Sequence, residues 1–331
     1  MQMRKLGKTG PEVSAIGLGA MGMSGMYGPA DRGESLATVH AALDAGINLI
    51  DTGDFYGMGH NEMLLGEALK GAPRDSYLLS VKFGAQRDPR GAFLGFDGRP
   101  AAVKTALAYS LQRLGVDHID IYRPARLDPN VPIEDTVGAI AELIKAGYVR
   151  HIGLSEVGSA TIRRAAAVHP IVDLQIEYAL VSRGIEDGIL DTTRELGIGI
   201  TAYGVLSRGL ISGHATSDTA QPGDFRGHSP RFQGENLAKN LELAERLRAA
   251  AATIGLTPAQ AAIAWVAAKG DDMVPLVGAR RRDRLAEALG ALKAPLIPAQ
   301  VAALETAVPR GSAAGTRYPE IQMAMLDSEK R

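Results

Sequence analysis

The chain has 331 residues, of which 46% are hydrophobic and 22% charged, and its formal net charge is −1. This balance argues against a nucleic-acid or membrane-surface partner, since both attract an excess of basic residues. The absence of cysteine excludes disulfides, thiolate metal ligands and cysteine nucleophiles. No run approaches the roughly 18 apolar residues of a membrane span, and no apolar signal-peptide segment follows the first basic residues, so we expect a cytoplasmic protein.

The first residues have the pattern of a small β-hairpin, with a turn over 8–11, and we predict it over residues 1–14. A run that matches G-x-G-x-x-G, from Gly17 to Gly22, follows. In a dinucleotide-binding Rossmann fold, a helix opens at the third glycine of this motif. Here the helical pattern begins only near Gly33. We therefore favour a first barrel strand, whose glycines allow close packing or the approach of a ligand.

A repeated order of helix, glycine and strand fills most of the chain. Helical patterns end at Gly46, Gly115, Gly147 and Gly197, and a β-branched or aromatic run follows each glycine. That order is typical of parallel sheets. We expect eight strands, near residues 14–19, 47–51, 77–82, 118–122, 149–154, 171–177, 198–203 and 273–277. The predicted fold is an α/β (β/α)8 TIM barrel that forms one domain over residues 1–331.

Two segments depart from the short connections of such a barrel. Residues 206–234 are rich in Gly, Ser, Pro and Asp, and a loop of this length is usually functional. We expect helices at 236–254 and 257–268 after it, and extra C-terminal helices near 281–292 and 298–308. The tail at 311–331 is too irregular to assign, and the sequence leaves its conformation open, including a return over the mouth of the barrel.

The central chemistry lies where the second and third predicted strands end. Asp51 closes one apolar run, Lys82 closes the next, and Tyr56 projects from the loop between them. A buried carboxylate is costly unless it is paired, and Lys82 is the obvious partner. A phenol is a poor acid at neutral pH, but a nearby ammonium lowers its pKa. We therefore predict an acid–base device in which Tyr56 exchanges the proton, Lys82 activates it and Asp51 holds Lys82.

Nearly every predicted strand delivers a glycine or a polar residue to the same end of the barrel, which is where TIM-barrel active sites lie. Basic residues also cluster after the eighth strand, at Arg280–Arg284, a position where barrels often bind phosphate. The residues at the strand ends are Gly19, Asp51, Lys82, Tyr122, Arg123, Ser155, Glu156, Gln175, Glu177, Tyr203 and Gly278.

Several of these segments together resemble the aldo-keto reductase family, in its bacterial and plant long-chain type. Residues 51–57, DTGDFYG, are similar to the family's D-T-A-x-x-Y-G motif. The segments at 80–84, 149–156 and 173–178 resemble its lysine strand and its nicotinamide-binding strands. Residues 274–287 resemble the segment that holds the adenosine phosphate. The resemblance implies a metal-free reduction of a small-molecule aldehyde or ketone by NADPH.

The resemblance also implies roles for the cofactor-binding residues. Ser155 and Gln175 would bind the nicotinamide carboxamide, and Tyr203 would stack on the nicotinamide ring. Arg208 would lie along the pyrophosphate, Arg280 and Arg284 on the 2′-phosphate, and Glu287 near the adenine. The full predicted cofactor set is Gly19, Ala20, Met21, Ser155, Glu156, Gln175, Tyr203, Gly204, Leu206, Arg208, Gly209, Gly278, Arg280, Arg284 and Glu287.

The chain departs from the family pattern where the fourth strand ends. A histidine is usual there, and this sequence has Ala125. The missing imidazole leaves Arg123 or Arg126 as possible substitutes for binding the substrate oxygen or a substrate carboxylate. We expect these two arginines, together with Tyr27 and Phe55, to line the substrate pocket.

Two other functions remain open on the sequence. Ala125 makes a regulatory nucleotide-binding barrel with little turnover plausible. Lys82 would alternatively form a Schiff base in an aldolase-like barrel, although that role leaves Gln175, Tyr203 and the arginine cluster less well explained. The sequence gives neither the physiological substrate nor the oligomeric state.

Overall fold

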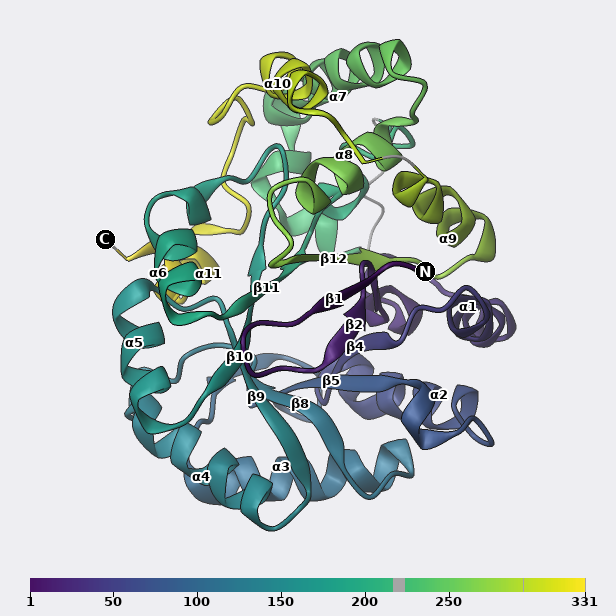
Figure 1. The fold of residues 1–331 in the computed structure, drawn as a ribbon. Coiled ribbons are helices and arrows are strands. Elements are labelled where there is room, and N and C mark those ends of the chain that lie inside the picture. The colour runs from purple at the N-terminus through teal and green to yellow at the C-terminus, as the bar shows by residue number, and fades with distance from the viewer. Residues whose placement is uncertain (217–223, 294, 331) are drawn as a thin grey trace.

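The computed structural model describes residues 1–216, 224–293 and 295–330. Residues 217–223 of the predicted 206–234 loop lie outside the described residues. Eight parallel strands form a closed barrel, in the order β10-β11-β12-β3-β4-β5-β8-β9, and the helices surround it (Figure 1). The strands are β3 (Gly17–Gly19), β4 (Leu49–Gly53), β5 (Leu78–Phe83), β8 (Ile119–Pro124), β9 (Val149–Ser155), β10 (Ile171–Glu177), β11 (Gly199–Tyr203) and β12 (Met273–Gly278). The predicted (β/α)8 barrel is thus confirmed.

A helix follows most of the barrel strands and turns its apolar stripe inward. In α4, the side chains of Ile133, Val137 and Ile140 recur at helical spacing and are all buried. Gly115 ends α3 in the left-handed conformation that glycine adopts without strain. The helices up to α6 are α1 (Arg32–Asp44), α2 (His60–Ala68), α3 (Pro100–Leu114), α4 (Ile133–Lys145), α5 (Ser159–Val168) and α6 (Ile189–Leu196).

Between β11 and β12 the chain forms two helices, α7 (Gly234–Thr253) and α8 (Pro258–Ala267). Thr257 and Gln260 cap the second one reciprocally. Beyond β12 lie α9 (Arg282–Leu289), α10 (Pro298–Ala307) and the short α11 (Glu320–Ala324). No single helix in the described parts of the chain passes the length and hydropathy test for a membrane span, and α7 and α8 pass it only as a pair bent by 80°.

The predicted N-terminal hairpin is present as β1 (Met3–Lys5) paired with β2 (Glu12–Ser14), and it crosses the amino-terminal end of the barrel (Figure 1). Leu6 and Val13 from the hairpin are fully buried. They pack on inward-facing barrel residues, Leu49, Ile121, Val172, Val274 and Leu276. The hairpin therefore closes this end of the barrel with apolar side chains, and the polar residues meet at the other end.

A second hairpin, which the sequence did not predict, lies between β5 and α3. Its strands are β6 (Ala85–Arg87) and β7 (Phe93–Phe96). They are short, their register shifts between Gln86 and Arg87, and their residues are mostly half-buried or exposed. Such strands lack the alternation of apolar and polar residues from which strands are predicted.

Candidate active site

The predicted pairing of Asp51 and Lys82 is present on the neighbouring strands β4 and β5. The Lys82 Nζ donates to Asp51 Oδ1 at 2.5 Å, and both side chains are at most 7% exposed. The other carboxylate oxygen accepts from Ser80 Oγ at 2.9 Å and from Gln175 Nε2 at 2.7 Å. Because both oxygens of Asp51 are engaged, the carboxylate holds the ammonium in one place.

Tyr56 opens the 3₁₀ helix η2 (Tyr56–Gly59) directly after β4. The Lys82 Nζ lies 5.1 Å from the centroid of its ring, and the ring of Phe55 packs edge-on against it at 4.8 Å between centroids. Gly57, Met58 and Gly59 all have left-handed backbone, which turns the chain back sharply at this point. The structure therefore brings the three predicted catalytic residues together.

The pKa of Tyr56 differs from the one expected from the sequence. Burial raises the pKa of Tyr56 well above its ordinary value, and the charge of Asp51 raises it further. Burial also lowers the pKa of Lys82 to about 8, although Asp51 opposes this shift. The pKa of Tyr56 is therefore raised overall and not lowered as expected, because desolvation of the phenolate outweighs any stabilisation that Lys82 provides. Tyr56 is a protonated phenol at neutral pH.

Arg123 was predicted to line the substrate pocket, and this prediction is wrong. Its side chain is fully buried within the barrel. The Nη1 donates to Asp173 Oδ2 at 2.8 Å and to Thr201 Oγ1 at 3.2 Å, and the Nη2 donates to Ser80 Oγ at 2.9 Å. Arg123 points inward because the buried carboxylate of Asp173 requires a cation nearby. Arg123 supports the Asp51–Lys82 pair through Ser80.

Arg126 lies in the loop after β8, at the carboxyl end of the barrel. It donates to its neighbour's carbonyl, Ala125 O, at 2.6 Å and to Ser155 Oγ at 3.3 Å. Its Nη2 reaches the hydroxyls of Tyr203 and Tyr318 at 3.5 and 3.4 Å. Of the two candidate arginines, only Arg126 faces the groups predicted to surround a substrate.

The predicted nicotinamide and phosphate residues follow four consecutive strands around the barrel. Ser155 ends β9, Gln175 is near the end of β10, Tyr203 ends β11 and Gly278 ends β12. These strands are neighbours in that order. An elongated ligand therefore has a continuous row of end-of-strand residues to follow.

The loop after β11 has an unusual backbone. Gly204, Ser207, Arg208 and Gly209 all have positive φ angles. For Ser207 and Arg208 this conformation is strained, and such strain gathers at functional sites. Leu206, which is half-buried, packs against the barrel core and anchors the loop.

The side chains of Arg280 and Arg284, both predicted to bind the 2′-phosphate, point toward different partners. The Arg280 Nη1 donates to three carbonyl oxygens, those of Tyr27, Gly28 and Pro29, at 2.9–3.1 Å. An open pocket of about 710 Å³ is adjacent to it, lined by Pro29, Ala30, Asp31, Glu34, Arg280, Arg281, Arg282 and Asp283. Arg284 points away from this pocket, toward His214 and Glu287.

The glycine-rich run at residues 17–22 is a barrel strand and the turn after it. A side chain at Gly17 would collide with Leu276, because its Cβ would lie only 2.6 Å from that side chain, so this glycine serves packing. At Gly19 the nearest atoms would be 3.7 Å away, which leaves ordinary space. Ala20 is buried, and its amide donates to Asp51 O at 2.9 Å, while Met21 opens the 3₁₀ helix η1 (Met21–Ser24).

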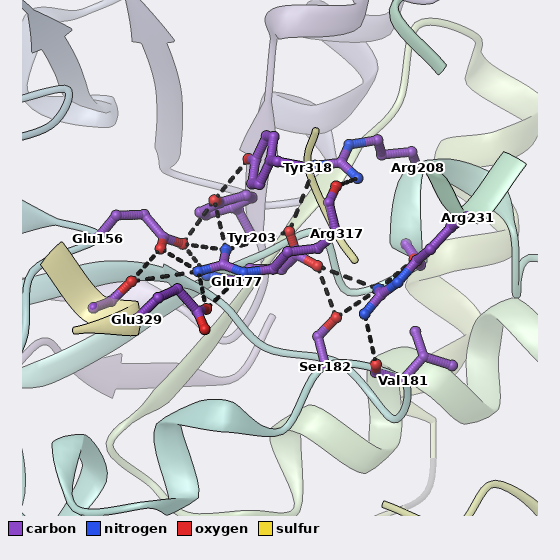
Figure 2. A network of polar contacts seen from close by, with 12 residues as sticks. Glu156, Glu177, Val181, Ser182, Tyr203, Arg208, Arg231, Arg317, Tyr318 and Glu329 are labelled. Carbon is purple, nitrogen blue, oxygen red and sulfur yellow. Dashed lines mark hydrogen bonds and ion pairs between the residues drawn. The ribbon is translucent and has the colours of Figure 1, made fainter. Parts of the chain in front are cut away.

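The C-terminal tail folds over the mouth of the barrel, which was one of the arrangements that the sequence left open, and it contributes residues that the sequence did not identify. Arg317 donates to both oxygens of Glu156, at 2.9 and 2.6 Å, and also pairs with Glu329 at 2.7 Å (Figure 2). The hydroxyl of Tyr318 lies 2.9 Å from the hydroxyl of Tyr203. The predicted nicotinamide-stacking residue therefore contacts the tail.

This network changes the expectation for Glu156. Its Oε1 also accepts from Tyr203 OH at 2.7 Å and from the Glu177 amide at 2.9 Å, and its Oε2 accepts from Ser328 Oγ at 2.7 Å. With both oxygens engaged by protein groups, Glu156 anchors the tail and is not free to bind a cofactor. Arg208 likewise donates to Arg317 O at 2.7 Å, and its guanidinium lies over the Tyr318 ring at 4.5 Å.

The chain is similar to known proteins along most of its length. The family model described as "Aldo/keto reductase family" matches residues 15–309. A probable aldo-keto reductase 1 of Glycine max is 41% identical over 320 residues, which is 96% of this chain and 92% of that protein. The structure is similar to a glycerol dehydrogenase from Gluconobacter oxydans, with a TM-score of 0.83, 28% identity, and 92% and 94% of the two chains covered. It is also similar to a thermostable aldo-keto reductase solved with the inhibitor epalrestat, with a TM-score of 0.73, 27% identity, and 93% and 100% coverage.

Proposed function

The chain belongs to the aldo/keto reductase family, and we propose that it uses NADPH to reduce aldehydes and ketones to alcohols. Membership of the family makes it an oxidoreductase, while the cofactor and the residue roles are our proposal. The observation that carries the proposal is the buried Lys82 ammonium, held by Asp51 at 2.5 Å and lying 5.1 Å from the Tyr56 ring.

Reduction of a carbonyl requires a hydride at carbon and a proton at oxygen. Bound NADPH would supply the hydride. The Tyr56 hydroxyl donates its proton to the carbonyl oxygen as negative charge develops there. The adjacent Lys82 ammonium stabilises the phenolate that remains, and Asp51 keeps the ammonium in position. In the direction of alcohol oxidation, Tyr56 accepts the proton.

The residues present fit a dinucleotide. The nicotinamide end is assigned to Ser155, Gln175 and Tyr203, and the strained loop at 204–209 is assigned to the pyrophosphate. The adenosine end is assigned to the pocket beside Arg280, where guanidinium groups favour a 2′-phosphate. The four consecutive strands that carry these groups support the assignment. Glu156 is left out of it, because its two oxygens hold the tail.

The structure bears on the Schiff-base alternative in two opposing ways. The lowered pKa of Lys82, caused by burial, favours a nucleophilic amine. The short ion pair with Asp51 opposes it, because a paired ammonium is not a nucleophile. Borohydride trapping of a carbonyl compound on Lys82 would support the aldolase chemistry, and its failure, together with NADPH consumption, would exclude it.

The test of the proposed function is NADPH oxidation against a panel of aldehydes, ketones and dicarbonyls, with alcohol formation measured alongside. We expect one molecule of alcohol to form for each molecule of NADPH oxidised. Tight NADPH binding without turnover on any carbonyl compound would instead support the regulatory barrel.

A further inference from the structure

Most arginines around the mouth of the barrel have a carboxylate partner. Arg208 and Arg231 each lie 3.6 Å from Glu177, and Arg317 pairs with Glu156 at 2.6 Å (Figure 2). These pairs offset the cost of burying the guanidinium charges. Arg126 and Arg280 are exceptions: across the parts of the chain that the structure describes, no carboxylate forms an ion pair with either, and Arg280 is held by three backbone carbonyls.

The contacts of Arg126 are all with neutral oxygens, namely a carbonyl, a serine hydroxyl and two phenols. The contacts to Tyr203 and Tyr318, at 3.5 and 3.4 Å, are long for hydrogen bonds. A guanidinium offers five N–H donors in a planar fork that matches a carboxylate. Its second nitrogen, Nη2, is therefore only weakly engaged and still able to receive a negatively charged partner.

Arg126 also lies beside the reacting groups. It contacts Ser155 and Tyr203, which the proposed function places around the nicotinamide. Its positive charge acts on both Tyr56 and Lys82 and favours the deprotonated form of each. An anion bound to Arg126 would therefore lie close to the proposed proton donor.

We propose that the preferred substrates are aldehydes or ketones that carry a carboxylate, and that Arg126 binds this carboxylate. The inference rests on the proposed function and adds the substrate class to it. Arg123, the other candidate, is committed to Asp173 within the barrel and is not part of this site. Binding a carboxylate replaces two long contacts to neutral phenols by hydrogen bonds in which donor and acceptor are both charged, in the bidentate geometry that guanidinium favours.

The test compares acidic aldehydes with neutral analogues of similar shape. The pairs are 4-carboxybenzaldehyde with methyl 4-formylbenzoate, and succinic semialdehyde with butanal. For each pair, the ratio of kcat/KM values is measured in the wild type, Arg126→Met, Arg126→Lys and Arg150→Met. Arg150 is the matched control, because it is exposed near the opposite end of the barrel, at the start of β9.

We expect the wild type to prefer the acidic member of at least one pair. Arg126→Met should reduce that preference roughly 10- to 100-fold, as expected for a lost charge-assisted contact. Arg126→Lys should retain part of the preference, and Arg150→Met all of it. An equal loss on acidic and neutral substrates in Arg126→Met would overturn the inference, because Arg126 would then act on the reacting carbonyl.

A second measurement does not depend on turnover. Calorimetry follows the binding of 4-methylbenzoate, a carboxylate without a hydroxyl to oxidise, to the wild type and to Arg126→Met, each saturated with NADP⁺. Binding that is lost in the variant would support the carboxylate site even if the enzyme reduced no aldehyde, in which case only the proposed function would fail. Equal binding by both proteins would overturn the inference while leaving carbonyl reduction intact.

Discussion

Arg317 in the C-terminal tail and Glu156 at the end of β9 form a two-pronged ion pair between residues 161 positions apart. Burial alone would raise the pKa of Glu156, but Arg317, aided by the charge of Arg126 and the Glu177 amide, outweighs burial and holds the pKa well below its ordinary value. Because Glu156 also accepts from Tyr203, this pair joins the tail to the residue assigned to the nicotinamide ring. The seating of the tail therefore depends on the charge of one buried carboxylate.

The first prediction follows from this pair. Arg317→Met and Glu156→Gln should release the tail, which hydrogen exchange over residues 309–330 would measure as faster exchange. Arg310→Met is the control, since Arg310 lies in the same segment but pairs with Asp187 at the surface. Unchanged protection in Arg317→Met would mean that other contacts hold the tail.

The same pair predicts a dependence on acid. A carboxylate whose pKa is depressed by folding contributes stability above its unfolded pKa, about 4.3 for Glu, and this stability is lost as the pH falls further. In the wild type, protection of the tail, corrected for intrinsic exchange rates, should decline below about pH 4.3. Glu156→Gln should show no such decline, and an identical pH profile in the two proteins would contradict the assignment.

A third prediction concerns Lys82. Its pKa is lowered by burial to about 8, while that of Tyr56 is raised well above 10. As the pH rises through 8, Lys82 loses the charge that stabilises the developing phenolate, while Tyr56 keeps its proton. The kcat/KM for reduction should therefore fall above about pH 8, and Lys82→Arg should move this fall to higher pH. A fall near pH 8 that persists in Lys82→Arg would belong to another group.

Asp54 gives a prediction for stability. Burial, together with the nearby Glu62, raises its pKa to about 7, and its Oδ1 has no partner among the described residues. An acid whose pKa is raised by folding stabilises the protein below its unfolded pKa, and this contribution is lost as the pH rises toward 7.

Asp54→Asn should therefore remove this pH dependence and stabilise the protein at pH 8, by on the order of 1–3 kcal/mol. Urea unfolding at pH 5 and pH 8 would measure the difference, with the exposed Asp75→Asn as control. A variant that is less stable than the wild type at pH 8 would contradict the raised pKa.

The cofactor assignment predicts that NADPH binds more tightly than NADH. Arg280→Ala should reduce that preference by roughly 10-fold or more, the scale of one charge-assisted contact. Because Arg280 also holds the carbonyls of residues 27–29, the binding of NADH in the variant reports any loss of loop structure. Arg281→Ala, whose guanidinium pairs with Asp283 beside the same pocket, is the comparison. Equal affinities of the wild type for the two cofactors would defeat the assignment.

The barrel and the clustering of Asp51, Tyr56 and Lys82 could be predicted because their signals are local. The glycine that ends a helix lies only a few residues before the next strand. Asp51, Tyr56 and Lys82 lie within 32 positions of sequence. Even here the strand boundary was off, since β4 continues through Thr52 and Gly53 beyond Asp51. The ends of strands are predicted from the periodicity of apolar residues, which locates an element more reliably than its first and last residues.

The remainder of the site depends on partners that no local pattern reveals. Arg123 and Arg126 looked equivalent in sequence, and the buried Asp173 on β10, which pairs with Arg123, separates them. Asp173 lies on a predicted barrel strand, and a carboxylate buried in the barrel requires a cation nearby, so its presence was a signal that an arginine or lysine would point into the barrel. Arg317 and Tyr318 lie in a tail without periodicity, so nothing local marked them as contacts of Glu156 and Tyr203.

The central claim is that Tyr56 delivers the proton, and Tyr56→Phe tests it most directly. The variant loses one buried hydroxyl and retains the ring that packs against Phe55 and Lys82. NADPH affinity is measured by fluorescence and the single-turnover rate of aldehyde reduction by stopped flow, on the same preparation. We predict an unchanged NADPH affinity and a reduction rate lower by roughly 100-fold or more, the scale of a positioned general acid. A variant that binds NADPH normally and reduces the aldehyde at close to the wild-type rate would contradict the account.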